Sequence, residues 1–358
     1  MIFRRRGGQH PSRVPSRYTR DSLPPSVHLS AFSVVDDVPE EEPPRRRYEE
    51  IRHLAEAAET AGLRTLWIAE HHFHPGGLCP SPPVLLAWVG ARTERLRLGV
   101  MVSVLPFHAP IDLAEQYALL DQLVGGRLSL GVGSGYIPME FDGFGVRTEE
   151  KRERFESHLA TLLAAFRGEE VQGEAPGAKP VRINVRPHQR PQPPLWIAVQ
   201  RREPIPFLAR AGRSIALVPY ASVSGLAELA EEIREYRENL PAGSDGRVAA
   251  AVHLYAGSRP ELARSCLARY LETRRATQST NYLARVAEDP RRADPSTLEE
   301  AGFALFGTAE SVRRRLGEYE RAGVDEILGI FDFGGLPLAE VVGSVRSLGA
   351  AWVPPRAP

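Results

Sequence analysis

The chain has 358 residues, of which 42% are hydrophobic, enough for one large α/β barrel or for two ordinary domains. Its 45 basic and 45 acidic residues cancel, so no overall charge attracts nucleic acid or an anionic membrane surface. No stretch reaches the ~18 consecutive apolar residues that a membrane-spanning helix requires. The two cysteines, Cys79 and Cys266, are too few for a disulfide framework. These features favour a cytoplasmic protein and exclude nucleic-acid-binding and membrane-embedded classes.

The first 25 residues contain a basic run, Arg4-Arg5-Arg6, followed by Gly, Gln, Pro and Ser instead of the apolar segment of an export signal. We therefore expect residues 1–25 to be a disordered basic leader or the product of an upstream start codon, and we assign them no function. A single domain is expected over residues 26–355.

Short apolar segments along the rest of the chain predict eight buried strands, mostly separated by segments whose apolar residues recur at helical spacing. Strands that alternate with helices form βαβ units, and eight of them predict a single (β/α)8 TIM barrel with insertions. A doubly wound fold would need a glycine-rich fingerprint after the first strand, and none is present. The predicted strands are 27–35, 65–69, 96–105, 127–132, 195–199, 215–218, 248–255 and 326–331, and the predicted helices are 48–58, 82–92, 112–123, 149–166, 259–274, 309–321 and 337–348.

Two segments interrupt the alternation. Residues 168–194 contain Gly, Pro and scattered β-branched residues, and we expect them to be an insertion with a short hairpin. Residues 275–302 are charged, contain Pro290 and Pro295, and show no periodicity. A tract of this length predicts a mobile lid over the site.

The most informative segment is Glu70-His71-His72, with His74 close behind, because it directly follows the second predicted strand. Catalytic groups of parallel barrels lie at the carboxyl ends of strands, although a single histidine there is often only a hydrogen-bonded structural group. His71, His72, His74 and Cys79 lie within nine residues, which also suggests zinc. Adjacent residues of a strand point to opposite faces, so His71 and His72 cannot easily share a metal, and we predict no metal site.

The third strand and its continuation, Leu98–Phe107, are apolar apart from Ser103 and lead into His108. This pattern predicts a hydrophobic wall with one polar group at its rim, which suits a flat aromatic cofactor.

Two further strand ends have groups that suit phosphate. After the fourth strand, Gly133-Ser134-Gly135-Tyr136 lets the backbone approach a ligand closely and exposes N–H groups to phosphate oxygens. After the fifth strand, Gln200-Arg201-Arg202 offers an arginine pair that could bind phosphate bidentately. The alternative is that both arginines are simply solvated.

Together these segments resemble the bacterial luciferase-like flavin monooxygenases, and the resemblance extends from about Val27 to Pro354. It implies a luciferase-like barrel that binds reduced FMN at its carboxyl-terminal mouth and oxygenates a small organic or natural-product substrate with O2 through a C4a-(hydro)peroxyflavin. It also implies a two-component system in which a separate flavin reductase supplies the reduced FMN. The segments that carry it include Glu70-His71-His72-Phe73, Leu96-Arg97-Leu98-Gly99, Leu120-Asp121-Gln122, Gly125-Gly126-Arg127-Leu128, Phe306-Gly307-Thr308-Ala309-Glu310 and Phe333-Gly334-Gly335-Leu336-Pro337.

The resemblance also implies roles for individual residues. The histidine matching His71 is important for catalysis, and Glu70 and His72 belong to the same constellation. Our hypothesis is that His71 acts as the acid or base near the flavin and that Glu70 tunes or orients it. The cofactor is expected to lie against Met101 and Val102, often through a non-proline cis peptide, and to contact a wider set of residues: His108, Gly133, Ser134, Gly135, Tyr136, Gln200, Arg201 and Arg202.

The chain departs from luciferase at two of these positions. Gly133 and Ser134 stand where luciferase has a reactive cysteine and a phosphate-binding arginine, so light emission is not inferred. Arg201 or Arg202 could replace the lost phosphate contact. Two alternatives stay open: an oxidoreductase that uses the deazaflavin F420 for hydride transfer, and a non-catalytic flavoprotein or subunit. We also expect a homodimer that pairs through helices near the start of the barrel, while the substrate and the type of oxygenation stay open.

Overall fold

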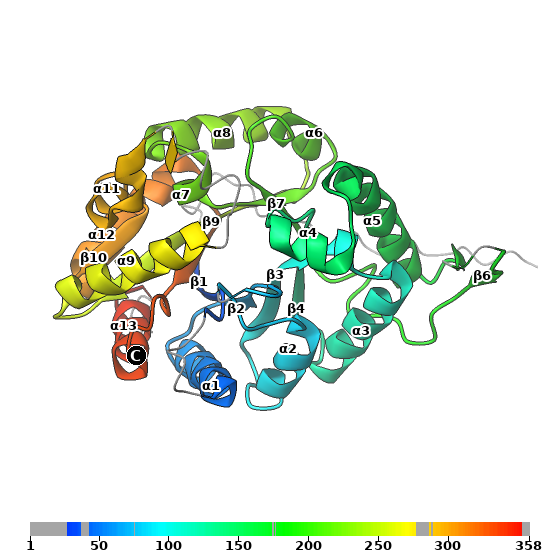
Figure 1. Ribbon diagram of the computed structural model, residues 1–358, viewed down its shortest axis with the longest axis horizontal. Helices are drawn as coiled ribbons and strands as arrows, with labels where there is room; N and C mark the ends of the chain where they lie inside the picture. The colour runs from blue at the N-terminus through cyan, green and yellow to red at the C-terminus, as the bar shows by residue number, and fades with distance from the viewer. Residues whose placement is uncertain are drawn as a thin grey trace, which may run out of the picture.

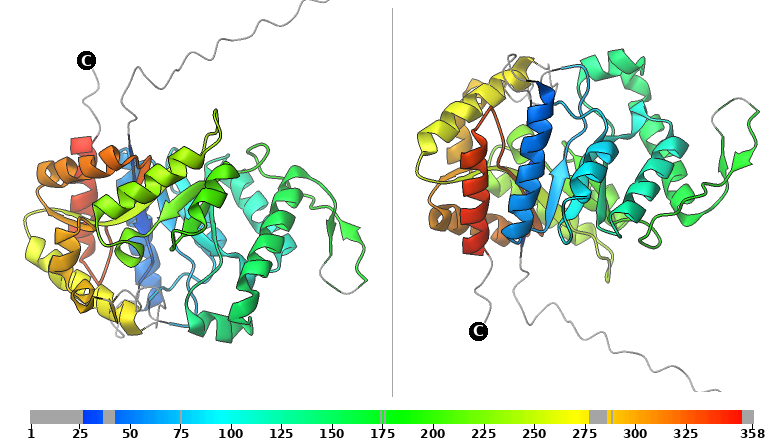
Figure 2. Two further views of the ribbon diagram at one scale, coloured as in Figure 1. Left: turned by 90° about the horizontal axis from the view of Figure 1, so that it is seen from above. Right: turned by 90° about the horizontal axis from the view of Figure 1, so that it is seen from below.

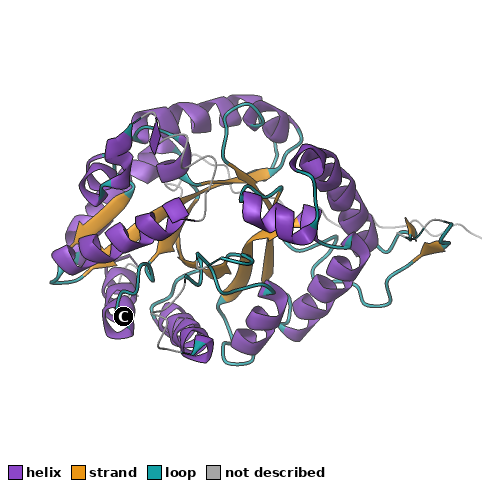
Figure 3. Cartoon of the chain, viewed as in Figure 1, coloured by secondary structure: helices purple, strands orange, loops and turns teal. Residues whose placement is uncertain are grey.

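The computed structural model describes residues 27–36, 43–74, 76–173, 175, 177–276, 286–287 and 289–352. Eight parallel strands form a closed barrel that helices surround, as Figures 1 and 3 show. The predicted (β/α)8 barrel is confirmed, because the last strand of the set pairs with the first. In order around the barrel the strands are β1 (His28–Ser33), β2 (Thr65–Ile68), β3 (Arg97–Val104), β4 (Leu128–Gly133), β7 (Leu195–Val199), β8 (Ser214–Leu217), β9 (Val248–Ala256) and β11 (Glu326–Ile330).

The helices pack their apolar stripes against this barrel. In the first helix, for example, Ile51, Leu54, Ala55 and Ala58 are buried at helical spacing. The first and last helices lie side by side and cover the seam where the barrel closes (Figure 2). The helices are α1 (Pro44–Thr60), α2 (Pro82–Gly90), α3 (Pro110–Leu123), α4 (Pro138–Phe144), α5 (Lys151–Arg167), α6 (Ile205–Arg210), α7 (Pro219–Ser222), α8 (Leu226–Asn239), α9 (Pro260–Ala276), α11 (Pro295–Glu300), α12 (Ala309–Ala322) and α13 (Leu338–Trp352), with 3-10 turns η1 (Leu105–Phe107), η2 (Thr148–Glu150) and η3 (Pro290–Ala293).

A further parallel strand, β10 (Ala304–Gly307), pairs with the carboxyl-terminal half of β9. This strand was not predicted from the sequence, because its four residues come just after a tract without periodicity. Within that tract, 275–302, residues 277–285 and 288 lie outside the described residues. The described end forms η3 and α11, where Leu298 is buried. The leader predicted at residues 1–25 also lies outside the described residues.

The segment 168–194 carries a small antiparallel pair, β5 (Val171–Gln172) and β6 (Pro180–Val181). This pair stands away from the barrel, as both views in Figure 2 show. None of the helices in the described part of the chain is both long and apolar enough to span a membrane.

A polar network fills the amino-terminal end of the barrel. The Glu326 carboxylate accepts hydrogen bonds from Ser30 Oγ at 2.7 Å and Trp67 Nε1 at 2.9 Å, and it pairs with Arg247 at 2.9 Å. These contacts join β1, β2, β11 and the residue before β9 near the amino-terminal ends of the strands, so they stabilise this end of the barrel. The opposite, carboxyl-terminal end holds the groups that are available for chemistry.

Candidate active site

A buried carboxylate, Glu140 of α4, gathers two histidines of the loop after β2 at the barrel mouth. Its Oε1 atom lies 3.0 Å from His71 Nδ1, 3.0 Å from His74 Nε2 and 3.0 Å from the His72 backbone nitrogen. We call His71, His74 and Glu140 the Glu140 triad. All three side chains are buried, so their charges act on one another with little screening by water.

The protonation states of the Glu140 triad follow from its contacts. Burial would raise the pKa of Glu140, but the hydrogen bonds from His71 and His74 outweigh it and lower the pKa to about 2. The ionised carboxylate must therefore accept from both rings. Burial lowers the pKa of His71 against the opposing effect of Glu140, so this ring is neutral near pH 7. His71 then carries its proton on Nδ1 and leaves the Nε2 lone pair as a base.

A second carboxylate, Glu70, holds the other histidines of the mouth. Its Oε1 atom lies 3.1 Å from His72 Nε2 and 2.8 Å from His108 Nε2, and its Oε2 atom accepts from Ser103 Oγ at 3.0 Å. We call Glu70, His72 and His108 the Glu70 triad. Burial opposes ionisation of Glu70, yet the hydrogen bonds from His108 and His72 lower its pKa, and Glu70 in turn raises the pKa of His108 above its ordinary value.

This arrangement corrects one of our predictions. We expected Glu70 to orient His71, but Glu140 makes that contact while Glu70 bonds to His72 and His108. The reason is the alternation of an extended chain, which sends Glu70 and His72 to one side and His71 to the other. The structure thus brings Glu70, His71 and His72 to one end of the barrel but divides them between two carboxylates.

Each triad has two histidines and one glutamate, which is also a ligand set for metal ions. The hydrogen bonds argue against a metal in the Glu140 triad. His74 Nδ1 accepts the Gly76 N–H at 3.0 Å, so the ring proton lies on Nε2. That nitrogen has no lone pair for a metal, and it donates to Glu140 instead.

The predicted cofactor wall lies at the carboxyl ends of β3 and β4. The Met101–Val102 peptide bond is cis, the arrangement that the resemblance implied at this position. Gly131 and Gly133 leave room for this segment, since a Cβ atom would lie 3.0 Å from Met101 Sδ at Gly131 and 2.7 Å from Val102 Cγ2 at Gly133. These two glycines therefore have a packing role, and the binding role of Gly133 stays a prediction.

Beyond the glycines, Tyr136 reaches the other side of the mouth. Its ring meets the His71 ring edge-on at 6.3 Å, and its hydroxyl accepts a hydrogen bond from Arg274 of α9 at 2.9 Å. Burial raises the pKa of Tyr136 to about 12, so the phenol stays neutral. Tyr136 thus connects the catalytic candidate His71 with a buried cation.

The two arginines predicted to bind phosphate after β7 have different neighbours. Arg202 is exposed and pairs with Glu235 of α8 at 2.6 Å, so this guanidinium is already neutralised. Arg201 lies close enough to Lys151 for its charge, together with burial, to lower the Lys151 pKa. Neither Arg201 nor Lys151 has an ion-pair partner among the described residues. Gln200 and Ser134 are half-buried near the same strand ends.

A cavity of about 500 Å³ lies beside His108 and thus borders the Glu70 triad. Its volume is within the roughly 300–1,000 Å³ range of small-molecule sites. Phe107 and Phe144 line it and stack with their ring centroids 4.9 Å apart.

Sequence reasoning missed Glu140, Arg274 and Lys151. Glu140 follows the glycine-rich loop by only a few residues, and this proximity to a predicted strand end was the signal that could have identified it. Arg274 had no such signal, because it lies in the last turn of α9 among many other arginines.

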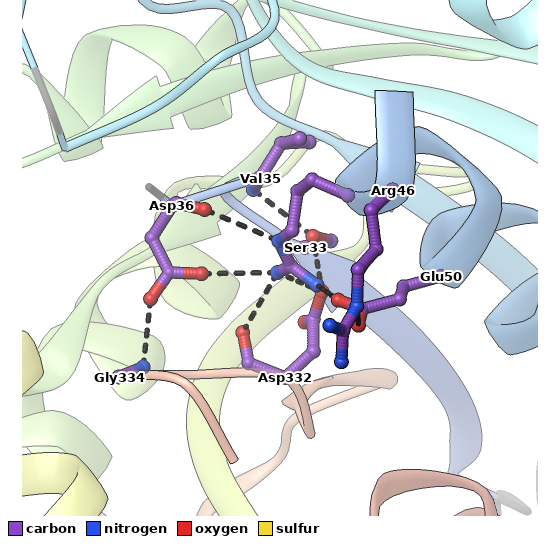
Figure 4. A network of polar contacts seen from close by, with 8 residues as sticks. Ser33, Val35, Asp36, Arg46, Glu50, Asp332 and Gly334 are labelled. Atoms are coloured by element: carbon purple, nitrogen blue, oxygen red, sulfur yellow. Dashed lines mark hydrogen bonds and ion pairs between the residues drawn. The ribbon is translucent and has the colours of Figure 1, made fainter. Parts of the chain in front are cut away.

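A different buried network lies at the seam between β1 and β11, and Figure 4 shows it from close by. Arg47 of α1 pairs with Asp36 at 3.0 Å and with Asp332 at 2.7 Å, and Ser33 Oγ donates to Asp332 at 2.5 Å. Asp36 also accepts the Gly334 backbone N–H at 2.7 Å. We call these residues the Arg47 network. It ties α1 to the two strands at which the barrel closes.

Comparisons with known proteins give the family. Residues 27–326 match the family model described as luciferase-like monooxygenase. An uncharacterized protein, y4wF of Sinorhizobium fredii, is 33% identical over 86% of this chain and 92% of its own length. The oxygenase component of a flavin-dependent trigonelline monooxygenase of Acinetobacter baylyi is 26% identical over 54% of this chain and 54% of its own.

Among solved structures, the monooxygenase RslO1 from Streptomyces bottropensis is similar with a TM-score of 0.75 and 26% identity. The match covers 90% of this chain and 98% of that one. The fold, the extent of the family match and the named relatives agree with one another. The chain belongs to the luciferase-like monooxygenase family.

Proposed function

We propose that this protein is the oxygenase component of a two-component flavin-dependent monooxygenase, which uses reduced FMN from a separate reductase and O2 to oxygenate a small organic substrate. Support comes from the family match and from relatives that are named flavin-dependent monooxygenases. A cytoplasmic location belongs to the same proposal, and the buried, unpaired Cys79 and Cys266 are compatible with it.

The observation that carries this proposal is the pairing of His71 with Glu140. The carboxylate fixes the proton of a neutral imidazole on Nδ1, so Nε2 keeps a lone pair that can act as a base. The same logic of a histidine held in one tautomer by a carboxylate operates in many acid–base sites. His71 can therefore take a proton at Nε2 and return it. The Glu70 triad adds two more histidines, His72 and His108, that are hydrogen-bonded to a carboxylate at the same mouth.

The residues at the mouth fit an isoalloxazine ring. Val102, Ser134, Gly135 and Tyr136 are half-buried at the ends of β3 and β4, so part of their surface is available to a flat ligand. A reduced flavin, when bound, supplies the chemistry with O2, and the protein provides orientation and a water-poor site. Met101, which is buried, and Val102 would exclude water on one side.

The phosphate of FMN would lie near Arg201 and Lys151. Both are cations beside the β7 end, and Lys151 is the first residue of α5, where the helix dipole also favours an anion. This assignment replaces Arg202, whose charge Glu235 already balances, and Gln200 would complete the site. Arg201 and Lys151 would thus supply the positive charge that an arginine supplies in luciferase at the position of Ser134.

Anaerobic titration with reduced FMN and, separately, with reduced F420 tests the proposal. We expect saturable binding of reduced FMN and, after air is admitted, consumption of O2. Binding of F420 without reaction with O2 would instead assign the chain to hydride transfer. Binding of neither would support a non-catalytic role and overturn the proposal.

We also propose that two copies of the chain pair through α2 and α3. Val84 and Trp88 are one turn apart on α2 and 70% and 37% exposed, and Leu119 and Leu123 are similarly spaced on α3 and 50% and 66% exposed. Adjacent apolar stripes of this kind mark protein interfaces. Trp88→Glu should convert a dimer into a monomer in sedimentation analysis, whereas a wild-type monomer would contradict the pairing.

A further inference from the structure

His253 lies on β9, across the mouth from the predicted cofactor wall of β3 and β4. It is fully buried, and neither of its ring nitrogens has a hydrogen-bond partner among the described residues. Buried polar side-chain atoms are nearly always paired, so an imidazole with two unpaired nitrogens calls for an explanation. Burial, aided by the Arg274 charge, lowers the pKa of His253 to about 3. The ring is therefore neutral and offers one donor and one acceptor.

Aromatic side chains from three other elements surround His253. Tyr220 of α7, Tyr270 of α9 and Phe333, which follows β11, meet its ring edge-on at centroid distances of 5.3, 5.0 and 5.3 Å. Phe306 of β10 stacks on Phe333 with an interplanar angle of 15°. Aromatic rings therefore surround the two polar nitrogens, and such a lining suits an aromatic ligand better than a flexible aliphatic one.

Arg274 adds a positive charge to the same region. It lies one helical turn after Tyr270 on α9, with its guanidinium 5.5 Å from the centre of the Tyr270 ring. It is buried, and it donates to Tyr136, whose ring contacts His71. Burial lowers the pKa of both His71 and His253, and the Arg274 charge lowers each further, so this cation acts on both histidines.

We infer that Arg274, Tyr136 and His253 form the substrate-recognition site of this enzyme and that its substrate is a planar aromatic compound with an ionised oxygen, such as a phenolate. The inference rests on the proposed function, because it places the substrate beside His71. Arg274 would bind the ionised oxygen, and His253 would pair with a second polar group of the substrate. The tyrosines and Phe333 would hold its ring. A charge-assisted bond to a buried guanidinium is among the stronger polar contacts in proteins.

Binding of 4-nitrophenol to the full chain, with and without oxidised FMN, tests this inference, because its absorbance reports the ionised form directly. We expect the phenolate to bind roughly 10–100-fold more tightly than the neutral ether 4-nitroanisole, as a bond to a charged group predicts. Arg274→Met should abolish this preference and leave the affinity for the ether within about threefold. Arg275→Met removes an exposed arginine from the same turn of α9 and should change neither affinity.

Equal binding of phenolate and ether by the wild-type chain would overturn the inference without any variant, so a variant that fails to fold cannot obscure the result. An equal loss in Arg275→Met would also overturn it, since it would indicate attraction by surface charge. A separate titration with reduced FMN keeps the two proposals apart. If FMN binds but the phenolate has no advantage, only this inference fails, whereas a phenolate advantage supports it whether or not FMN binds.

Discussion

The barrel has two groups of buried carboxylates at its carboxyl-terminal end, and they differ in the nitrogen-bearing group that each contacts. In the two triads, Glu70 and Glu140 contact imidazoles. In the Arg47 network, Asp36 and Asp332 contact a guanidinium. An imidazole can lose or gain a proton near neutral pH, whereas a guanidinium stays charged. The triads therefore suit proton transfer, and the Arg47 network suits attachment of α1 to the barrel.

The largest effect is expected from the group that orients His71. Glu140→Gln should lower the rate of substrate oxygenation by about 10²–10⁴-fold, because a neutral amide oxygen holds the two ring protons more weakly than a charged carboxylate oxygen does. The rate of product formation and the share of O2 released as hydrogen peroxide measure this effect. Glu153→Gln, an exposed change on α5, serves as control. If Glu140→Gln forms product at the wild-type rate and releases no additional hydrogen peroxide, His71 does not have the proposed role.

Next in size is a change in the Arg47 network. Arg47→Met leaves Asp36 and Asp332 buried without their cation, and we expect a loss of about 3–5 kcal/mol in the free energy of unfolding. Urea denaturation measures it. Arg46→Met is the matched control, because Arg46 has a side chain that is 58% exposed and should cost less than about 1 kcal/mol. Equal losses of unfolding free energy in Arg47→Met and Arg46→Met would show that the buried network stabilises the protein no more than an exposed ion pair does.

Asp332 should make stability depend on pH. Burial raises its pKa from 3.8 to about 6 against the attraction of Arg47. The folded state then binds the proton more tightly than the unfolded state, so this group stabilises the protein fully below pH 4. The contribution falls as the pH rises to 6, by at most about 3 kcal/mol.

Urea denaturation of wild type and Asp332→Asn between pH 4 and 7 measures this effect, because the carboxylates outside the Arg47 network cancel in the difference. Asp332→Asn should gain stability relative to wild type as the pH rises through that window. Asp112→Asn, on the exposed face of α3, serves as control, and its free energy of unfolding should depend on pH as that of wild type does. A constant difference between wild type and Asp332→Asn would mean that Asp332 titrates normally.

The smallest effect is expected at Glu70. Glu70→Gln should reduce product formation by about tenfold, one order of magnitude or about 1.4 kcal/mol, because this carboxylate contacts His72 and His108 but not His71. It should also lower the pKa of His108, which NMR titration can follow. A loss as large as that of Glu140→Gln would restore Glu70 to the orienting role that the sequence first suggested.

Much of the fold was predictable, because each barrel strand is a short buried run between helical segments. The bounds predicted for β7, 195–199, agree with the structure, whereas β10 was hidden behind a tract without periodicity. The site was only partly predictable. Glu70 and His71 are adjacent in sequence but bond to different partners, and Glu140 meets His71 across 69 positions of the chain. A contact between residues so far apart in the chain produces no periodic pattern, so a single sequence does not predict it.

The most direct test of the account is the protonation state of His71. Nitrogen-15 NMR of histidine-labelled protein distinguishes the tautomers, and the His71→Gln variant identifies the resonance. We predict a ring that is neutral above pH 7, with the proton on Nδ1 and a bare Nε2, and that changes in Glu140→Gln. A His71 ring that stays protonated above pH 7, or that carries its proton on Nε2, would contradict the role proposed for His71.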